Sequence, residues 1–261
     1  MPREFVNWTR EKNIAIVVVD NPPVNALSLK VAVELLDCLK EINAVESCRA
    51  IVITGAGEKA FCAGASIKEI AELVSASASS LPYTEQLHTT MNYLQEVSVP
   101  TIAAINGYAL GGGLETALAC DLRIASEKAL LGLPEIKLGI FPGAGGTQRL
   151  PRLIGIPLAK EMLFTGLPLT AEEALKIGLV NKVVPHGEVL DAAKELAHLM
   201  ASRPGAALKL LKEAVDRGIK GSLEEGCRLE RDLLERVFNT EDAKEGIDAF
   251  LEKREAKFTH R

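Results

Sequence analysis

Apolar and polar positions along the chain follow two different patterns, one typical of buried strands and one typical of amphipathic helices. Residues 14–19 form an unbroken apolar run that ends at a turn rich in Asn and Pro, as a buried strand does. The next segment predicts a helix with Ser28 as its N-cap, because apolar residues recur there at helical spacing: Val31, Leu35, Leu36, Leu39 and Ile42. A second apolar run over residues 50–54 predicts another buried strand. This strand–helix–strand order indicates a parallel sheet covered by helices.

The same two patterns divide the rest of the chain into a region with strands and a region with helices alone. Strands are predicted over residues 101–105 and 121–125, and short strands followed by glycine-rich loops recur to about Val184. Beyond His186 only helical periodicity remains, in roughly three segments interrupted at residues 203–205, 218–221 and 239–240. Capping boxes are expected at Thr170 with Glu173 and at Ser222 with Glu225. We therefore predict an α/β core over residues 1–185 and a helical region over residues 186–261.

Composition narrows the class of protein. The chain has 261 residues, 48% of them apolar, and a net charge of -5, which argues against a general affinity for nucleic acid or for anionic membranes. Neither an apolar run long enough to span a bilayer nor a secretory signal is visible, so a cytoplasmic protein is expected. The five cysteines show no paired spacing, which predicts reduced thiols and no disulfide or metal site.

Two glutamates lie where a carboxylate is hard to explain by structure alone. Glu115 follows a triple glycine, and Glu135 lies between Leu133-Pro134 and Ile136, shortly before a second glycine cluster at residues 143–146. Both neighbourhoods are apolar and carry little other charge. Burial there would raise the pKa of each carboxyl toward neutrality, so both side chains are candidates for proton transfer.

The triple glycine at residues 111–113 predicts a backbone site for an anion. It follows a strand and opens a short helix, whose first N–H groups point outward at the positive end of the helix dipole. The loop at residues 60–68 is a second backbone-rich stretch, and one donor from each loop would make an oxyanion hole. The alternative is a tight turn that needs glycine only for its conformation.

One motif points elsewhere. Residues 55–60 match Gly-x-Gly-x-x-Gly/Ala after a strand, the pattern of a dinucleotide-binding loop. That loop should open a helix directly, whereas here it runs into the further loop Phe61-Cys62-Ala63-Gly64. Dinucleotide binding is therefore not favoured.

Four motifs together resemble those of the crotonase, or enoyl-CoA hydratase/isomerase, family. They occur in the family's order and at its usual separations, and the resemblance extends over essentially the whole chain. The motifs are Ala63-Gly64-Ala65-x-Ile67-Lys68, Asn106-Gly107-x-Ala109-x-Gly111-Gly112-Gly113-x-Glu115, Pro134-Glu135-x-x-Leu138-Gly139 and Pro142-Gly143-Ala144-Gly145-Gly146-Thr147-Gln148-Arg149-Leu150.

The resemblance implies a spiral core of ββα units with a helical C-terminal region that trimerises, often into a dimer of trimers. It implies an acyl-CoA thioester as substrate, with no metal or other cofactor, and an enolate stabilised by the backbone N–H groups of Ala65 and Gly112. Family members hold CoA or substrate at positions that match Ala63, Ser66, Ile67, Lys68 and Gly143. Two further matching positions on the last helix, Phe250 and Lys253, contact CoA, in some members across a subunit boundary.

The pair of glutamates predicts the reaction within this family. Hydratases of the family keep both carboxylates, whereas simple double-bond isomerases typically keep only the second. Adding water across the 2,3 double bond of a trans-2-enoyl-CoA needs a base for the water at C3 and an acid for C2. We assign Glu115 to the water and Glu135 to C2, which predicts a reversible enoyl-CoA hydratase of fatty-acid β-oxidation or related acyl-CoA metabolism.

Other functions stay open at this point. A specialised hydratase for a cyclic dienoyl-CoA or a methylglutaconyl-type CoA is one alternative, and an isomerase that uses the same enolate is another. Family members commonly carry Asp where this chain has Ser66, which bears on the choice of acyl group. Some crotonase-fold proteins bind RNA through a lysine-rich helix, but the matching helix here has only Lys68 beside Glu69 and Glu72.

Overall fold

A six-stranded sheet forms the centre of the molecule. The computed structural model describes residues 3–260, so the ends of the two predicted regions, residues 1–2 and 261, lie outside the described residues. The strand order is β1-β2-β3-β5-β7-β10, and every neighbouring pair is parallel except β1 with β2. The strands are β1 (Val6–Glu11), β2 (Ile14–Val19), β3 (Ala50–Gly55), β5 (Thr101–Ile105), β7 (Leu122–Ser126) and β10 (Lys182–Val184).

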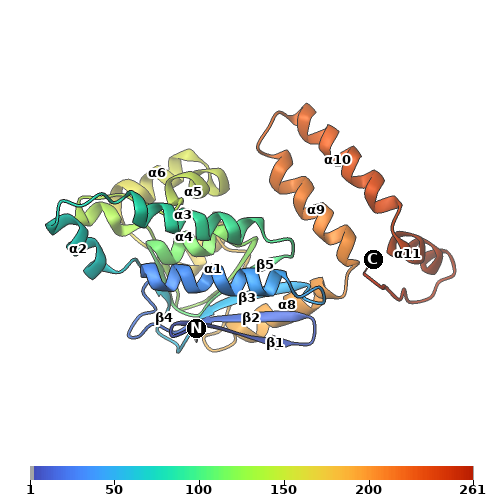
Figure 1. The fold of residues 1–261 in the computed structure, drawn as a ribbon, viewed down its shortest axis with the longest axis horizontal. Helices are drawn as coiled ribbons and strands as arrows, with labels where there is room; N and C mark the ends of the chain where they lie inside the picture. Colours follow the sequence, from blue (N-terminus) through green and yellow to red (C-terminus); the bar gives the residue numbers. More distant parts are fainter. Residues whose placement is uncertain (1–2, 261) are drawn as a thin grey trace.

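Helices cover both faces of this sheet, which explains why its strands are apolar on both sides (Figure 1). Alternate residues of β2 and β3 pack into one core with helices α1 (Leu29–Asn43) and α3 (Leu81–Glu96). The residues between them pack against helix α8 (Val189–Ala201) on the other face. Small side chains at every fourth position bring α8 close to the strands: Val189, Ala193, Ala197 and Ala201.

A second, four-stranded sheet places the glycine clusters. Its order is β4-β6-β8-β9, with strands β4 (Ala60–Ala63), β6 (Tyr108–Leu110), β8 (Leu130–Gly132) and β9 (Leu169–Thr170). Three times a strand of the first sheet is followed by a strand of the second and then by a helix, as in β3-β4-α2, β5-β6-α4 and β7-β8-η1. These helices are α2 (Ile67–Ser75), α4 (Gly112–Ala119) and the 3₁₀ helix η1 (Pro134–Leu138). The repeated ββα order therefore collects the loops after β4, β6 and β8 at one place.

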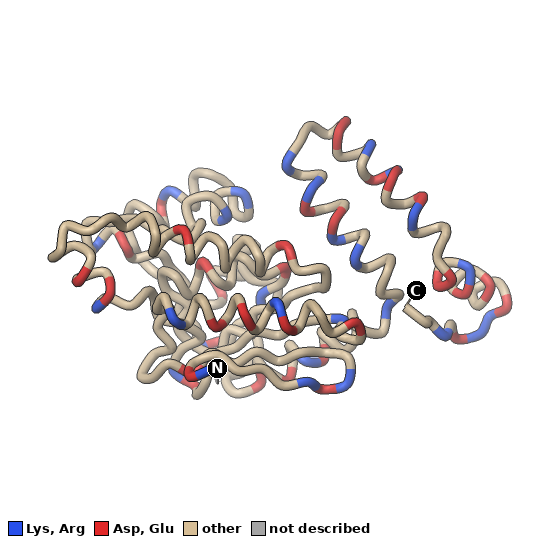
Figure 2. Tube along the Cα trace, in the orientation of Figure 1, with Lys and Arg blue, Asp and Glu red and all other residues tan. Residues whose placement is uncertain are grey.

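Three more helices complete the core, and the last three form an arm. The core helices are α5 (Gly146–Ile154), α6 (Ile156–Thr165) and α7 (Ala171–Lys176). Helices α9 (Gly205–Gly218), α10 (Leu223–Phe238) and α11 (Glu241–Leu251) extend away from the sheets (Figure 1). Charges of both signs are interspersed along α9 and α10 (Figure 2). No helix within residues 3–260 is both long and apolar enough to pass through a bilayer.

Most of the strands and helices predicted from the sequence are confirmed. Strand β5 has the predicted bounds, Ser28 caps α1 by accepting from the Val31 amide, and both capping boxes form. Between residues 187 and 260 the structure has four helices, not roughly three, because each of the three predicted interruptions separates two of them. The first of the four, α8, packs on the sheet instead of joining the arm. Strand β1 and helices α3 and α6 were not predicted, and the predicted loop at residues 61–64 instead contains most of strand β4.

Candidate active site

A cavity of about 590 Å³ lies where the ββα loops meet. Five of the predicted site residues line it although they come from four separate segments of the chain: Ala65, Gly112, Glu115, Glu135 and Gly143. The rest of the lining is mostly apolar and comes from α2, α3 and the segment before Gly143, with Ile70, Leu73, Val74, Leu87, Ile140 and Phe141. A few polar groups facing an apolar wall are typical of a small-molecule site.

The triple glycine makes the turn into α4 possible. Gly111 has a φ of 50°, and a Cβ atom there would lie 2.7 Å from Oε1 of Glu135. A Cβ atom on Gly113 would lie 1.8 Å from the carbonyl oxygen of Cys62, closer than any side chain can approach. Glycine is therefore required both for the backbone conformation and for the close approach of α4 to β4.

Two backbone amides face the cavity from these loops. Ala65 pairs with Leu27 in an isolated β-bridge. The neighbours of Ala65 make its hydrogen bonds: the Gly64 carbonyl accepts from the Leu27 amide, and the Ser66 amide donates to the Leu27 carbonyl. Gly112 is the first residue of α4, whose amide has no carbonyl one turn earlier in the helix. Within residues 3–260 neither the Ala65 nor the Gly112 amide donates a hydrogen bond. A Cβ atom on Gly112 would lie 3.6 Å from the Ala65 nitrogen, so the two donors are close together.

Glu115 is held firmly in the first turn of α4. Its side chain is 2% exposed, and its Oε1 accepts hydrogen bonds of 2.7 Å from the amides of both Ala144 and Gly146. Burial raises the pKa of Glu115, while the two amides and the charge of Arg149 oppose that rise. One oxygen is thus fixed by the second glycine cluster, which leaves Oε2 as the oxygen available for proton transfer.

Glu135 faces the same cavity from η1 without comparable support. Its Oε2 is buried and has no hydrogen-bond partner among the described residues. Burial, and to a smaller extent the charge of Glu115, raises the pKa of Glu135 to about 7. This carboxyl can hold or release a proton near neutral pH, as its sequence neighbourhood predicts.

The remaining predicted binding residues are divided between two places. Ala63 ends β4, Ser66 caps α2 by accepting from the Glu69 amide, and Ile67 and Lys68 are exposed in the first turn of α2. They lie beside the cavity on the chain segment that contains Ala65. Phe250, 83% exposed, lies instead on α11, and Lys253 follows two residues after that helix. Figure 1 shows α11 on the opposite side of the molecule from α2. One chain alone does not bring these two residues to the cavity.

Sequence reasoning missed three groups in this site. The Ala144 and Gly146 amides lie in a glycine cluster that we singled out, but only the structure shows that they bind Glu115. Tyr83 lines the cavity from α3, and its hydroxyl is buried. No motif marks Tyr83, since a single aromatic residue in a helix is usually a packing residue.

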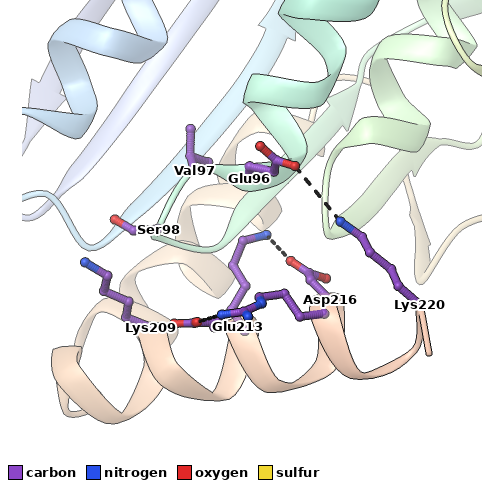
Figure 3. Close-up of a pocket in the computed structure, with 9 residues that line it drawn as sticks. Glu96, Val97, Ser98, Lys209, Glu213, Asp216 and Lys220 are labelled. Atoms are coloured by element: carbon purple, nitrogen blue, oxygen red, sulfur yellow. Dashed lines mark hydrogen bonds and ion pairs between the residues drawn. The ribbon is translucent and has the colours of Figure 1, made fainter. Parts of the chain in front are cut away.

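Other features of the chain do not form a comparable site. Residues 55–60 pass from β3 directly into β4 and open no helix, contrary to the dinucleotide-binding pattern. A smaller cavity of about 280 Å³ lies between the end of α3 and helix α9 and is lined by ion pairs (Figure 3). There Lys220 approaches Glu96 at 4.0 Å and Lys212 approaches Asp216 at 3.3 Å, so most of the charged side chains are paired with one another. In the part of the chain that the structure describes, no group of three His, Cys, Asp or Glu residues could hold a metal ion.

Comparison with known proteins gives one consistent result. The chain matches the family described as Enoyl-CoA hydratase/isomerase over residues 9–261. It is 43% identical over 262 residues to a probable enoyl-CoA hydratase of Mycobacterium tuberculosis, with 100% of both chains covered. It is 42% identical over 246 residues to a short-chain-enoyl-CoA hydratase of Clostridium acetobutylicum, with 94% of each covered. The crystal structure of an enoyl-CoA hydratase from Bacillus anthracis superimposes with a TM-score of 0.92 at 42% identity, covering 99% of this chain and 100% of that one.

Proposed function

Because the chain belongs to the enoyl-CoA hydratase/isomerase family, we propose that it is an enoyl-CoA hydratase, a hydro-lyase acting on acyl-CoA thioesters. The observation that carries this proposal is the joint placement of two carboxyls and two free amides on one cavity. An isomerase needs only one group that moves a proton, whereas hydration needs a base for water and an acid for carbon. Glu115 and Glu135 would supply these two groups.

The two amides would polarise the thioester. The Ala65 and Gly112 N–H groups, directed at the thioester oxygen, would stabilise the enolate that forms when water adds at C3. Such a donor lowers the barrier by about 3–4 kcal/mol. Because both amides belong to backbone already fixed by the glycine turn and by the bridge to Leu27, no reorganisation is needed during the reaction.

The glutamates would divide the proton transfers. Ionised Glu115 accepts a proton from the water as its oxygen bonds to C3, and protonated Glu135 gives a proton to C2. The net change is the addition of H and OH across the double bond, which gives a 3-hydroxyacyl-CoA. A proton then returns from Glu115 to Glu135, and two neighbouring carboxyls that share one proton allow this. Both carboxyls lie in one cavity, which fits addition of both groups to the same face.

Binding of CoA and assembly are proposals that go beyond one chain. Residues 63–68 would hold the CoA part beside the cavity, while Phe250 and Lys253 would reach CoA only in a neighbouring subunit. An apolar groove of about 380 Å³ between α9 and α10 supports association, because Leu211 and Leu234 expose 61% and 47% of their surface along it. We therefore propose a homotrimer or a hexamer formed by two trimers.

A steady-state assay tests this function. Loss of the conjugated enoyl-thioester absorbance should occur with straight-chain trans-2-enoyl-CoA substrates between C4 and C16, and the product should be 3-hydroxyacyl-CoA. Cyclic dienoyl and branched substrates in the same series test the specialised hydratases. Conversion of 3-enoyl-CoA to 2-enoyl-CoA without any hydration would contradict the proposal in favour of an isomerase.

A further inference from the structure

A buried tyrosine hydroxyl lies among the groups that line the cavity. Tyr83 is 9% exposed on α3 and lines the same cavity as Glu115 and Glu135. Its hydroxyl oxygen is buried and has no hydrogen-bond partner among the described residues. A buried phenol normally finds a partner, since an unmade hydrogen bond in the interior is costly. This arrangement is hard to explain if Tyr83 only fills space.

The surroundings make Tyr83 a donor and place it near Glu115. Burial raises the pKa of Tyr83, and the negative charges of Glu69 and Glu115, together with the Cys62 thiol, raise it further. The phenol therefore stays protonated at any physiological pH. The two carboxylates that act on it come from α2 and α4, and no cation is among the groups that shift its pKa.

The other hydroxyl on the same stretch of α3 is already engaged. Thr84 also lines the cavity, but its Oγ1 donates to the carbonyls of Ser80 and Leu81. Glu115 and Glu135 supply acceptor atoms, and Oε1 of Glu115 is already satisfied by two amides. Tyr83 thus supplies a buried side-chain donor from α3 on the cavity that contains both carboxyls.

We propose that Tyr83 takes part in the reaction by donating a hydrogen bond from its hydroxyl to the oxygen of the water that is added. This inference rests on the proposed hydratase function. A water molecule has two hydrogens and two lone pairs. Its hydrogens would point to Glu115 and Glu135, one lone pair would accept from Tyr83, and the other would face C3. Four fixed directions orient the nucleophile fully.

Such a donor is worth more in the transition state than in the ground state. As Glu115 removes a proton, the water oxygen gains negative charge, and a hydrogen bond to that oxygen becomes stronger. In the reverse direction the same hydroxyl stabilises the oxygen that leaves C3. Tyr83 acts on the water alone, so removal of C2 protons by Glu135 should not depend on it.

The test compares two reactions in Tyr83→Phe. Hydration of crotonyl-CoA should fall about 10- to 100-fold in kcat, with KM changed by no more than about threefold. Exchange of the C2 protons of butyryl-CoA in deuterium oxide needs the enolate but no added water, so it should stay within about threefold of the wild-type rate. Tyr93→Phe, a partly buried tyrosine of the same helix outside the cavity, is the matched control and should change neither reaction.

Three results would overturn the proposal for Tyr83. They are hydration at the wild-type rate, an equal fall of hydration and exchange, and a fall confined to KM. A lowered thermal midpoint of Tyr83→Phe would also count against it, because the substitution removes only an unpaired oxygen. Absence of hydration in the wild-type protein would instead refute the proposed function itself, so the two failures are distinguishable.

Discussion

The first turn of α4 and the 3₁₀ helix η1 present two carboxyls to one cavity in contrasting ways. Glu115 lies in a turn that is buried throughout, with one oxygen bound by two amides. Glu135 lies in a short helix with no buried residue, and its Oε2 has no partner among the residues described. A glutamate side chain is thus held by hydrogen bonds in the first turn of α4, whereas the glutamate in η1 has little such support.

This difference explains how two glutamates in one cavity can perform different tasks. Burial raises the pKa of Glu115, and the two amide donors limit that rise by stabilising the ionised form, which is the form that accepts a proton from water. Glu135 has a pKa raised to about 7 by burial and by the charge of Glu115, so it is suited to carry a proton to carbon. The different surroundings of Glu115 and Glu135 support the proposed roles of base and acid, which two identical side chains would not distinguish by themselves.

The strongest way to break the comparison is to remove each acid in turn. Glu115→Gln and Glu135→Gln should each lower kcat for hydration by several orders of magnitude, about 100- to 10,000-fold, because each loses one proton transfer. Acyl-CoA binding, measured by calorimetry, should survive in both.

The two variants should differ in a partial reaction. Glu115→Gln should retain exchange of C2 protons in a saturated acyl-CoA, whereas Glu135→Gln should lose it. Near-normal hydration by either variant would refute the assignment of both roles, and the opposite exchange pattern would reverse them.

Two glycine substitutions test the difference in rigidity between these regions. In Gly113→Ala the new Cβ would lie 1.8 Å from the Cys62 carbonyl oxygen, so α4 must move, at a cost of about 3 kcal/mol or more. In Gly139→Ala, at the end of η1, nothing lies within 4 Å, and only the φ of 74° opposes the change, at about 1–2 kcal/mol. Denaturant unfolding measures both. Equal costs would show that η1 is as tightly packed as α4.

The pH dependence of stability tests the raised pKa of Glu135. A carboxyl with a folded pKa near 7 and an ordinary value of 4.5 stabilises the fold most below about pH 4.5, and this contribution is lost as pH rises through 7. Glu135→Gln has no carboxyl to ionise at this position, so it does not lose this stability as pH rises. Its stability relative to wild type should therefore rise between pH 5 and pH 8, by about 1–2 kcal/mol after allowing for solvent at a half-buried group. A pH-independent difference would contradict the shift.

A smaller effect is expected from the support behind Glu115. Arg149 donates to the carbonyl of Ala144 and to the side chains of Gln95 and Asn92, which holds the loop that binds Glu115. Arg149→Lys keeps the charge but loses the planar fork, so kcat should fall about fivefold, or roughly 1 kcal/mol.

A second substitution at Arg149 separates charge from geometry. Arg149→Met removes the cation that lowers the pKa of Glu115, so the acidic limb of the kcat profile should move to higher pH. An unchanged pH profile in Arg149→Met would show that the charge of Arg149 does not affect the pKa of Glu115.

Local patterns predicted the fold better than they predicted the long-range pairings. Strands β2, β3 and β5 are continuous apolar runs, and Ser28 and Ser222 cap their helices as expected. Strand β1 was missed because it is an edge strand, and most of its residues are at least partly exposed, so its sequence is mixed. The second sheet was not foreseen as a sheet, since its strands are two to four residues long and depend on partners far along the chain.

In the candidate site, too, local patterns were predictable from the sequence and long-range contacts were not. Glu115, Glu135 and the two loops are visible in the sequence because glycines and isolated carboxyls stand out in apolar surroundings. The partners of Glu115 and the hydroxyl of Tyr83 are not visible, because α3, α4 and the second glycine cluster meet only after the ββα units have folded.

The alanine row on α8 has a consequence for how this sequence tolerates change. Methyl groups at residues 193, 197 and 201 let the helix lie directly on the sheet, on the face opposite α1 and α3. A larger side chain there would push on β3 and β5, whose continuations enter the cavity loops. A full map of tolerated substitutions should therefore contain a second sensitive region, on the reverse side of the molecule, where size alone is restricted and no chemistry takes place.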